Sequence, residues 1–383
     1  MSCSGGASVR LGEPRGNLIR INIGEVVSSL VAVQKASVSV KDVATLAGVS
    51  VGTVSNVVNS SAVVSETTRQ RVEDAIAQLG WVRNESARQL RAGRSRSIGM
   101  VVMEIANPFF TDIVGGAEDF VHARGYTVQL GNSDQNVSRE SAHLELFEEH
   151  RVRGVLVAPI REVSEHVARL QRHGIPVVVV DRAANQADCC SVAVDDVEGG
   201  RLAVAHLVDL GHQRIAFVGG PSTLQQVRDR SLGAQRAAAA LGGEDRLLTV
   251  STPRLDTESG VQVADQLAMM PAAERPTAVF AANDLLAIGL LQGFVTAGLR
   301  VPEDIALIGY DDITFAAAAA VPLSSIRQPR RLLGRRGAEL LFAEVDALDQ
   351  GLPHEHQHVR FIPELIIRRS TAGVGPGSRP RRT

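Results

Sequence analysis

The stretch that decides the fold of the N-terminal part is Ser39-Val-Lys-Asp-Val-Ala-Thr-Leu-Ala-Gly-Val-Ser-Val-Gly-Thr-Val-Ser-Asn-Val-Val-Asn59. Ser39, followed three residues later by Asp42, is typical of a helix N-terminal capping arrangement. Gly48 ends the helix that follows, and Ser50 can cap a second helix through the free amides of its first turn. The stretch therefore predicts two short helices joined by a tight glycine turn.

The apolar residues of both helices recur at three- and four-residue steps, so that the two helices face each other. They are Val43, Leu46 and Ala47 in the first helix, and Val54 with Val57 or Val58 in the second. This leaves the outer face of the second helix to Val51, Gly52, Ser55 and Asn56. Such a pair is how a chain places a helix in the major groove of DNA. An ordinary helical hairpin with a solvated outer face is the alternative interpretation.

A third helix is predicted from Ser65 to Gly80, with apolar positions at Val72, Ala75, Ile76 and Leu79. Basic residues moderately outnumber acidic ones around these three helices, which fits contact with phosphates. The three helices together predict a compact all-α module.

The composition is that of an ordinary soluble chain, with 383 residues, 44% hydrophobic and 21% charged. This length leaves room for two or three domains. No apolar run is long enough to span a bilayer, so we expect no membrane partner. Glu25 interrupts the apolar N-terminal segment and no small-residue cleavage site follows, so we expect no secretory signal and a cytoplasmic location.

From Ser97 onward, short apolar runs alternate with helical stretches. This alternation is typical of parallel sheets with helices on both faces. The first series of predicted strands is 98–103, 126–130, 154–158 and 176–181, and the second is 214–219, 277–281 and 304–309. The sequence thus predicts two α/β units in tandem.

Cysteine and histidine positions give little chemistry on spacing alone. Cys3, Cys189 and Cys190 form neither a disulfide framework nor a metal-ligand pattern, and reduced thiols are expected. His354-x-His-x-His358 could hold a metal if extended, but its polar, proline-containing context favours an exposed loop. No dinucleotide or phosphate-loop motif occurs, so we expect no enzyme activity, no cofactor and no metal.

Motifs spread over nearly the whole chain resemble those of the LacI/GalR family of bacterial transcription regulators. They are Asp42-Val-Ala-x-x-Ala-Gly-Val-Ser50, Thr53-Val-Ser55, Val57-Val-Asn59, Ala87-Arg-Gln-Leu90, Asn107-Pro-Phe-Phe110, Val180-Asp-Arg182, Leu210-Gly-His-Gln-Arg-Ile215, Arg230-x-x-Gly233, Asn283-Asp284, Gly309-Tyr-Asp-Asp312, Arg327-Gln-Pro329 and Pro363-Glu-Leu-Ile-Ile-Arg368. The resemblance runs from about residue 38 to about residue 371.

The resemblance implies an N-terminal helix-turn-helix domain followed by an α/β effector domain of the periplasmic-binding-protein type, built from two doubly wound parallel-sheet subdomains. We expect a disordered N-terminal extension (1–37), the helix-turn-helix domain (38–83), a hinge (84–96), the effector-binding and dimerisation domain (97–371) and a disordered tail (372–383). The first subdomain is expected at about 97–181 and 327–355, and the second at about 182–326 and 356–371.

The resemblance also implies a homodimer on double-stranded DNA with a near-palindromic operator. Asn84 can cap a hinge helix in which Ala87 is small and Leu90 is the leucine that wedges into the minor groove. A mobile linker is the alternative interpretation of this segment. Val51 can contact a thymine methyl, Gly52 allows close approach, and Asn56, which replaces a common arginine, can pair with adenine or hold a phosphate. The expected DNA-binding residues are Ser39, Ser50, Val51, Gly52, Thr53, Ser55, Asn56, Asn59, Asn84, Ala87 and Leu90.

Open α/β sheets bind ligands beyond the carboxyl ends of their strands. The effector-binding residues implied there are Phe109, Phe110, Asp181, Arg230, Asn283 and Asp284. Asp284 can accept and Arg230 can donate paired hydrogen bonds to vicinal hydroxyls, which predicts a sugar or sugar derivative. Leu224 replaces a polar contact of some relatives and disfavours a purine corepressor. Structural ion pairs and core phenylalanines are the alternative interpretation of these residues.

The sequence thus predicts a repressor whose operator binding is controlled allosterically by a small molecule. The alternative is a sugar-binding solute receptor of the periplasmic type, without a DNA function. Such a receptor would share the cleft, but it should carry a signal peptide and lack residues 39–90.

Overall fold

The computed structural model describes residues 38–58, 64–81, 95–161, 165–183, 189–239 and 247–372. The chain divides into two compact units, Met1–Arg88 and Gln89–Thr383.

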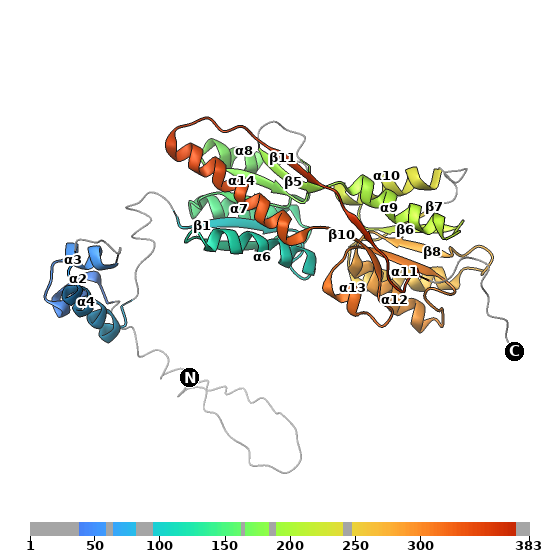
Figure 1. The fold of residues 1–383 in the computed structure, drawn as a ribbon, viewed down its shortest axis with the longest axis horizontal. Helices are drawn as coiled ribbons and strands as arrows, with labels where there is room; N and C mark the ends of the chain where they lie inside the picture. The colour runs from blue at the N-terminus through green and yellow to red at the C-terminus, as the bar shows by residue number, and fades with distance from the viewer. Residues whose placement is uncertain are drawn as a thin grey trace, which may run out of the picture. The chain divides into compact units, whose positions relative to one another are not determined.

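The first unit contains three helices, α2 (Val40–Ala47), α3 (Val51–Val58) and α4 (Glu66–Leu79) (Figure 1). The predicted capping arrangement at α2 is confirmed: the Ser39 hydroxyl donates to Asp42 Oδ2 at 2.7 Å, and the Ser39 amide donates to the same oxygen at 2.8 Å. Gly48 and Gly80 end α2 and α4 with left-handed φ values of 62° and 60°, a conformation that favours glycine.

The core of this unit is formed by Val43, Val54 and Val72, each with no exposed surface. The prediction that Leu46 belongs to this core is wrong, because its side chain is 46% exposed. The buried stripe of α2 runs through Val43, Ala44 and Ala47. Leu46 therefore lies at the margin of that stripe, where the two partner helices do not cover it.

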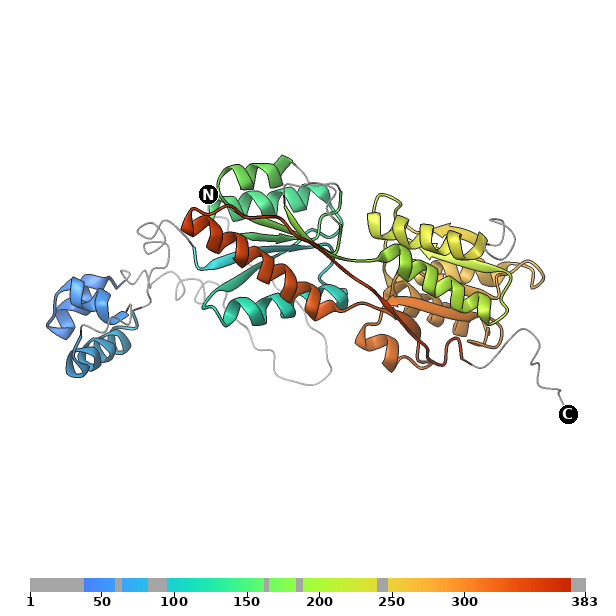
Figure 2. The same ribbon diagram turned by 45° about the horizontal axis from the view of Figure 1, so that its top comes forward.

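The second unit contains two six-stranded sheets. The first sheet has the order β11-β5-β4-β3-β1-β2, and all its neighbouring strands are parallel. Its strands are β1 (Ser97–Val102), β2 (Thr127–Asn132), β3 (Val155–Val157), β4 (Val177–Val180), β5 (Cys190–Val194) and β11 (His358–Phe361). Helices α6 (Pro108–His122) and α14 (Arg330–Gln350) pack together on one face, and α7 (Val137–Glu149) and α8 (Glu165–Arg172) pack together on the other (Figure 2).

The second sheet has the order β12-β10-β9-β8-β6-β7 and is parallel except for the antiparallel pair of β10 and β12. Its strands are β6 (Ile215–Gly219), β7 (Leu247–Ser251), β8 (Ala278–Ala281), β9 (Ala306–Asp311), β10 (Ser324–Arg327) and β12 (Glu364–Ile366). The helices of this subdomain are α9 (Asp196–Asp209), α10 (Gln225–Ala239), α11 (Thr257–Met269), α12 (Asp284–Thr296) and α13 (Thr314–Ala318).

The chain passes between the two subdomains after β5, after β10 and between β11 and β12 (Figures 1 and 2). Two of these crossings differ from the expected boundaries. Strands β5 and β11 lie within 182–326 and 356–371, the ranges expected for the second subdomain, but both belong to the first sheet. They pair with each other and extend that sheet beyond β4, so these two crossings come later than expected, after Val194 and after Phe361.

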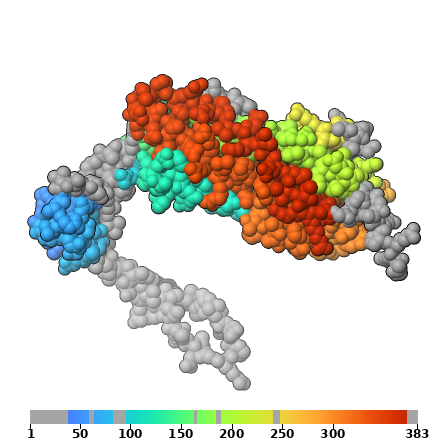
Figure 3. Space-filling model, viewed as in Figure 1, coloured from blue at the N-terminus to red at the C-terminus, as the bar shows by residue number. Residues whose placement is uncertain are grey.

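The C-terminal segment, red in the space-filling view, covers part of one face of both subdomains (Figure 3). None of the helices among the described residues is long and apolar enough to cross a membrane.

Candidate effector and DNA-binding sites

The outer face of α3 carries the residues expected to read DNA. Val51, Gly52 and Asn56 are exposed, whereas Val54 and Val57 are buried against α2 and α4. The Ser50 hydroxyl accepts a hydrogen bond from the Thr53 amide at 3.0 Å, so Ser50 caps the helix as predicted.

The other expected DNA-binding residues divide into two groups. Thr53 and Ser55 are half-buried on α3, and Ser39 is exposed at the start of α2. Asn59, Asn84, Ala87 and Leu90 lie outside the described residues.

In the second unit, two buried aspartates follow central parallel strands in left-handed backbone conformations. Asp181 follows β4 with φ of 64°, and Asp311 ends β9 with φ of 101°. A non-glycine residue in this region costs about 1 to 3 kcal/mol, and such residues cluster at ligand sites. Asp181 and Asp311 therefore indicate a ligand site at the carboxyl ends of the strands.

Arg230 on α10 is buried among acceptors and an aromatic ring. Its Nε lies 2.8 Å from Asp196 Oδ1, and its Nη1 donates to the Ala282 carbonyl at 2.6 Å. The guanidinium carbon lies 3.7 Å from the Tyr310 ring centroid, and Nη1 lies 3.9 Å from Asp311 Oδ1. Burial alone would lower the pKa of Arg230, but the Asp196 carboxylate and its neighbours raise it, so the guanidinium stays charged.

Asp311 faces residues from both subdomains. Gln328 donates to its Oδ1 at 2.7 Å, and the Asn107 side chain of the first subdomain also hydrogen-bonds to this carboxyl group. Burial raises the pKa of Asp311 to about 6, against the opposing effect of Arg230. The sequence contained a signal for Asp311 in the Gly309-Tyr-Asp-Asp312 motif, but this residue was not among those expected to bind the effector.

Asp181 is held by a residue of the opposite subdomain. Gln226 of α10 donates to Asp181 Oδ2 at 3.0 Å and to its carbonyl at 2.8 Å. Asp181 Oδ1 is buried and has no hydrogen-bond partner among the described residues. Burial, and then the nearby Asp196, raise the pKa of Asp181 well above its usual value. A small cavity of about 120 Å³ opens beside Asp181, Asp196 and Gln226.

Asp284 is not free to accept hydrogen bonds from ligand hydroxyls, although the sequence predicted that it would. It has no exposed surface, and its two oxygens accept from Ser325 Oγ at 2.7 Å and from the Ile313 amide at 2.8 Å. Gly309 of β9 approaches so closely that a Cβ there would lie 2.1 Å from Asp284 Oδ1. The two carboxylate oxygens of Asp284 that were expected to accept from hydroxyls therefore accept from β10 and from the start of α13 instead.

Asn283 caps the helix that follows it. Its Oδ1 accepts from the Leu286 amide at 2.9 Å and caps α12, and its Nδ2 donates to the Leu255 carbonyl at 3.0 Å.

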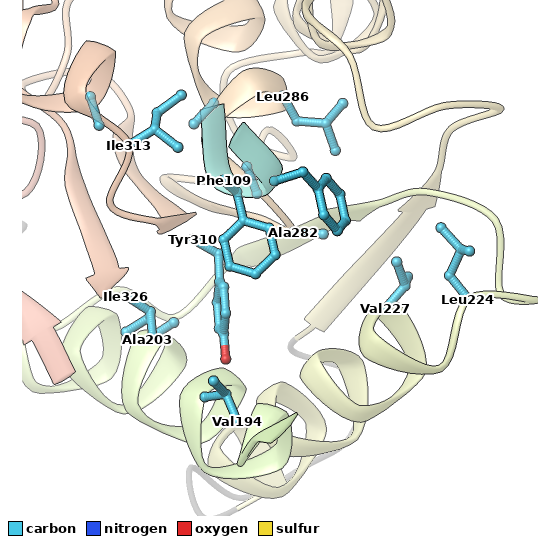
Figure 4. Close-up of a cluster of buried hydrophobic side chains, with 14 of the residues drawn as sticks. Phe109, Val194, Ala203, Leu224, Val227, Ala282, Leu286, Tyr310, Ile313 and Ile326 are labelled. Atoms are coloured by element: carbon cyan, nitrogen blue, oxygen red, sulfur yellow. The ribbon is translucent and has the colours of Figure 1, made fainter. Parts of the chain in front are cut away.

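Phe109 and Phe110 lie in the first turn of α6, which the Asn107 side chain caps by accepting from the Phe109 amide at 3.0 Å. The two rings meet edge to face, with centroids 5.0 Å apart, and both are buried. Phe109 belongs to one hydrophobic cluster with Leu224, Val227 and Ala282 of the second subdomain (Figure 4). The apolar side of the site thus contains groups from both subdomains.

An ion-pair cluster that the sequence did not reveal bridges the same two subdomains. Arg254, after β7, places Nη2 2.7 Å from Glu104 Oε2 and 2.7 Å from Asp134 Oδ1, which follow β1 and β2. Its Nε lies 3.2 Å from Asp256 Oδ2.

A helix-turn-helix module joined to two α/β subdomains, with a buried polar site between them, defines a DNA-binding regulator that responds to a ligand. Comparison with known proteins agrees with this class. Residues 39–84 match the family described as "Bacterial regulatory proteins, lacI family", and residues 204–371 match the "Periplasmic binding protein-like domain". The chain belongs to the LacI family of bacterial transcriptional regulators, a family of repressors and not of enzymes, whose operator binding is controlled by an effector.

Individual relatives cover nearly the whole chain. The HTH-type transcriptional repressor PurR of Photobacterium profundum is 34% identical over 334 residues, which are 87% of this chain and 98% of PurR. The Lac repressor dimer bound to operator and the anti-inducer ONPF has a TM-score of 0.74 at 28% identity, covering 88% of this chain and 99% of that one. The CelR–cellobiose complex has a TM-score of 0.62 at 32% identity, covering 87% and 99%. A LacI family regulator from Enterococcus faecium with bound ribose has a TM-score of 0.66 at 31% identity, covering 73% and 99%.

Proposed function

We propose that this repressor acts in the cytoplasm as a homodimer on a near-palindromic operator, and that its effector is a small polyhydroxylated molecule, a sugar or sugar derivative. The main observation in favour of a polyhydroxylated effector is the polar network around Arg230 and Asp311. That network joins both subdomains at the carboxyl ends of their strands.

The network suits hydroxyl groups because it offers donors and acceptors side by side. Arg230 is a buried charged donor, and Asp311 is a buried acceptor at neutral pH. Asp181 Oδ1 and Gln328 Oε1 are buried acceptors without partners among the described residues. Sugar hydroxyls can donate to such oxygens, and Phe109 can cover an apolar sugar face. Ribose and cellobiose occupy two of the similar regulators.

The proposed roles of two residues follow from their contacts. Asp311 takes the place that the sequence suggested for Asp284 as the carboxylate that grips the effector. Asp284 instead positions β9, β10 and the start of α13 around Asp311, since its oxygens are used by Ser325 and Ile313.

For DNA we propose that Val51 contacts a thymine methyl, that Gly52 lets α3 approach the bases, and that Asn56 pairs with adenine. The exposure of these three residues supports this proposal. We further propose that Leu90 inserts into the minor groove at the centre of the operator and bends it.

A thermal-shift screen tests the effector class. A ligand that binds only the folded state raises the melting temperature by mass action. We expect monosaccharides, disaccharides or sugar phosphates to raise it, with nucleobases and amino acids as the comparison. The shift should vanish in Asp311→Asn and persist in Asp304→Asn, which alters an ion pair with Arg300 at the opposite end of β9. A shift from nucleobases alone would contradict the sugar proposal, and an undiminished shift in Asp311→Asn would contradict the site.

A further inference from the structure

A second group of chemically reactive side chains lies in the first subdomain, apart from the effector site. Cys190, Glu344, His354 and His356 each present one possible metal-ligand atom, and these atoms all lie within 4.8 Å of one another. They come from β5, from α14 and from the connection between α14 and β11. The fold thus brings together side chains from three separate segments of the chain.

The distances fit a tetrahedral metal site. Cys190 Sγ lies 3.2 Å from His354 Nε2 and 3.8 Å from His356 Nδ1, and Glu344 Oε2 lies 3.9 Å from His356 Nδ1. With Zn–S bonds of about 2.3 Å and Zn–N bonds of about 2.0 Å, tetrahedral geometry places sulfur and nitrogen ligands roughly 3.5 Å apart. The two observed sulfur–nitrogen distances lie on either side of that separation, and the carboxylate oxygen is within 4.8 Å of the other three atoms, so modest side-chain rotations can admit an ion.

The local backbone explains why two of the three histidines join this group. Burial alternates along the connection from α14: His354 and His356 are half-buried, while Glu355 and Gln357 are exposed. This is the pattern expected where successive side chains point to opposite sides of the chain. His358 begins β11 and hydrogen-bonds instead to Ser191 Oγ at 2.9 Å. The exposed loop expected from the sequence is therefore exposed on one side only.

Two further contacts suit a bound cation. The Gln357 amide donates to Cys190 Sγ at 3.3 Å, an arrangement that stabilises a metal-bound thiolate. Glu344 Oε2 is buried and has no hydrogen-bond partner among the described residues. A pocket of about 450 Å³, lined in part by Glu344, His354 and His356, gives an ion access from solvent.

We propose that Cys190, Glu344, His354 and His356 form a binding site for a borderline-soft divalent transition metal, with Zn²⁺ as the best fit. One thiolate, two imidazoles and one carboxylate are ligands that Zn²⁺ prefers, whereas Ca²⁺ and Mg²⁺ prefer oxygen alone. The metal ties the connection before β11 to β5 and α14. This connection leads into β11, which the chain leaves at Phe361 to cross to the second subdomain, so the metal anchors the segment that precedes this crossing.

The test uses the full chain without an affinity tag, reduced and freed of metal with a chelator. We expect one equivalent of Zn²⁺ to bind in a calorimetric titration and to raise the melting temperature. Co²⁺ in its place should give the absorption of a tetrahedral, thiolate-ligated ion. Cys190→Ser and His356→Ala should each weaken binding at least about tenfold, and Cys190→Ser should also abolish the thiolate-to-cobalt band.

Matched controls separate this site from others. Cys189 packs on the opposite face of the sheet from Cys190, and His358 lies outside the cluster. Cys189→Ser and His358→Ala should therefore bind the metal as the parent chain does. Glu344→Gln keeps the side-chain volume and should weaken Zn²⁺ binding even if Cys190→Ser fails to fold. The proposal is overturned if the parent chain binds no stoichiometric Zn²⁺, or if the ligand variants bind as tightly as the controls.

Discussion

Arg254 of the second subdomain donates to Asp134 of the first at 2.7 Å, and the same Nη2 lies 2.7 Å from Glu104. Side-chain exposures of 40% for Arg254 and 36% for Asp134 place this contact at the edge of the interface. It therefore links the loops after β1, β2 and β7 without being part of the buried site.

We expect Arg254→Ala to favour separation of the subdomains and so to weaken effector binding. The effect should be modest, about two- to fivefold in Kd, because exposed ion pairs are worth roughly 0.2 to 1 kcal/mol and are screened by salt. Calorimetric titration at low and high salt measures it. Arg300→Ala, which removes an exposed ion pair within one subdomain, is the control and should leave Kd unchanged. Equal Kd values for the parent chain and Arg254→Ala at low salt would show that the Arg254 contacts do not contribute to effector binding.

Arg230→Ala should destabilise the second unit strongly. It leaves Asp196 and Asp311 buried without their cation, and breaking a buried pair in this way costs about 3 to 5 kcal/mol. Arg228→Ala is a matched control, because Arg228 is exposed and donates to the carbonyls of Ser222 and Thr223. Urea denaturation should show a loss near 0.5 kcal/mol or less for the control. Similar losses of unfolding free energy in Arg230→Ala and Arg228→Ala would contradict a stabilising role for the buried Arg230 network.

Asp311 makes the free energy of unfolding depend on pH. The pKa of Asp311 is about 6 in the folded chain, against 3.8 for an unperturbed aspartate, the value taken for the unfolded chain. Between pH 3.8 and about 6, this carboxyl group is therefore protonated in the folded chain and ionised in the unfolded chain. The folded state is then favoured at low pH, and its advantage falls as pH rises from about 4 to about 6, by up to about 3 kcal/mol. The carboxyl group faces Arg230, Gln328 and Asn107, and more distantly Asp196.

Asp311→Asn removes this contribution. The difference in unfolding free energy between parent and variant should fall through this pH range, as measured by urea denaturation at successive pH values. A difference that is constant with pH, or that rises, would contradict the raised pKa.

Asn56→Ala should weaken specific operator binding by about 1 to 3 kcal/mol and leave nonspecific binding nearly unchanged. Asn56 is exposed, so the module should keep its stability. The fluorescence of Trp81, the single tryptophan, which packs on the module's core, checks this. Gln78→Ala on the exposed face of α4 is the control. Equal losses on operator and scrambled DNA would contradict base readout by Asn56.

Local patterns in the sequence predicted much of this fold. Val177–Val180 and Ala278–Ala281 are apolar runs that become fully buried strands, and the Ser39 and Gly48 signals mark the two ends of α2. Cys190–Val194 was missed, because its cysteine and serine interrupt the apolar pattern although all five residues are buried. His358–Phe361 was missed because its pairing with β5 depends on residues 167 positions earlier in the chain.

The site was predicted in position more accurately than in detail. The carboxyl ends of the strands located Asp181 and Arg230, but side-chain direction at a strand end depends on tertiary contacts. Asp284 turns inward to Ser325, and Asp311 turns toward Arg230. The cluster at Cys190 and Glu344 depends on three separate segments, and no local spacing could reveal it.

The central claim is that a ligand in the cleft controls specific DNA binding, and fluorescence anisotropy on an operator selected from random duplexes tests it most directly. At about 0.15 M salt, the full chain should bind this duplex at least about 10³-fold tighter than a scrambled one. Adding the effector found by thermal shift should change the operator Kd, and Asp311→Asn should bind operator without responding. Equal affinity for both duplexes, or an operator Kd that the effector leaves unchanged, would contradict the account.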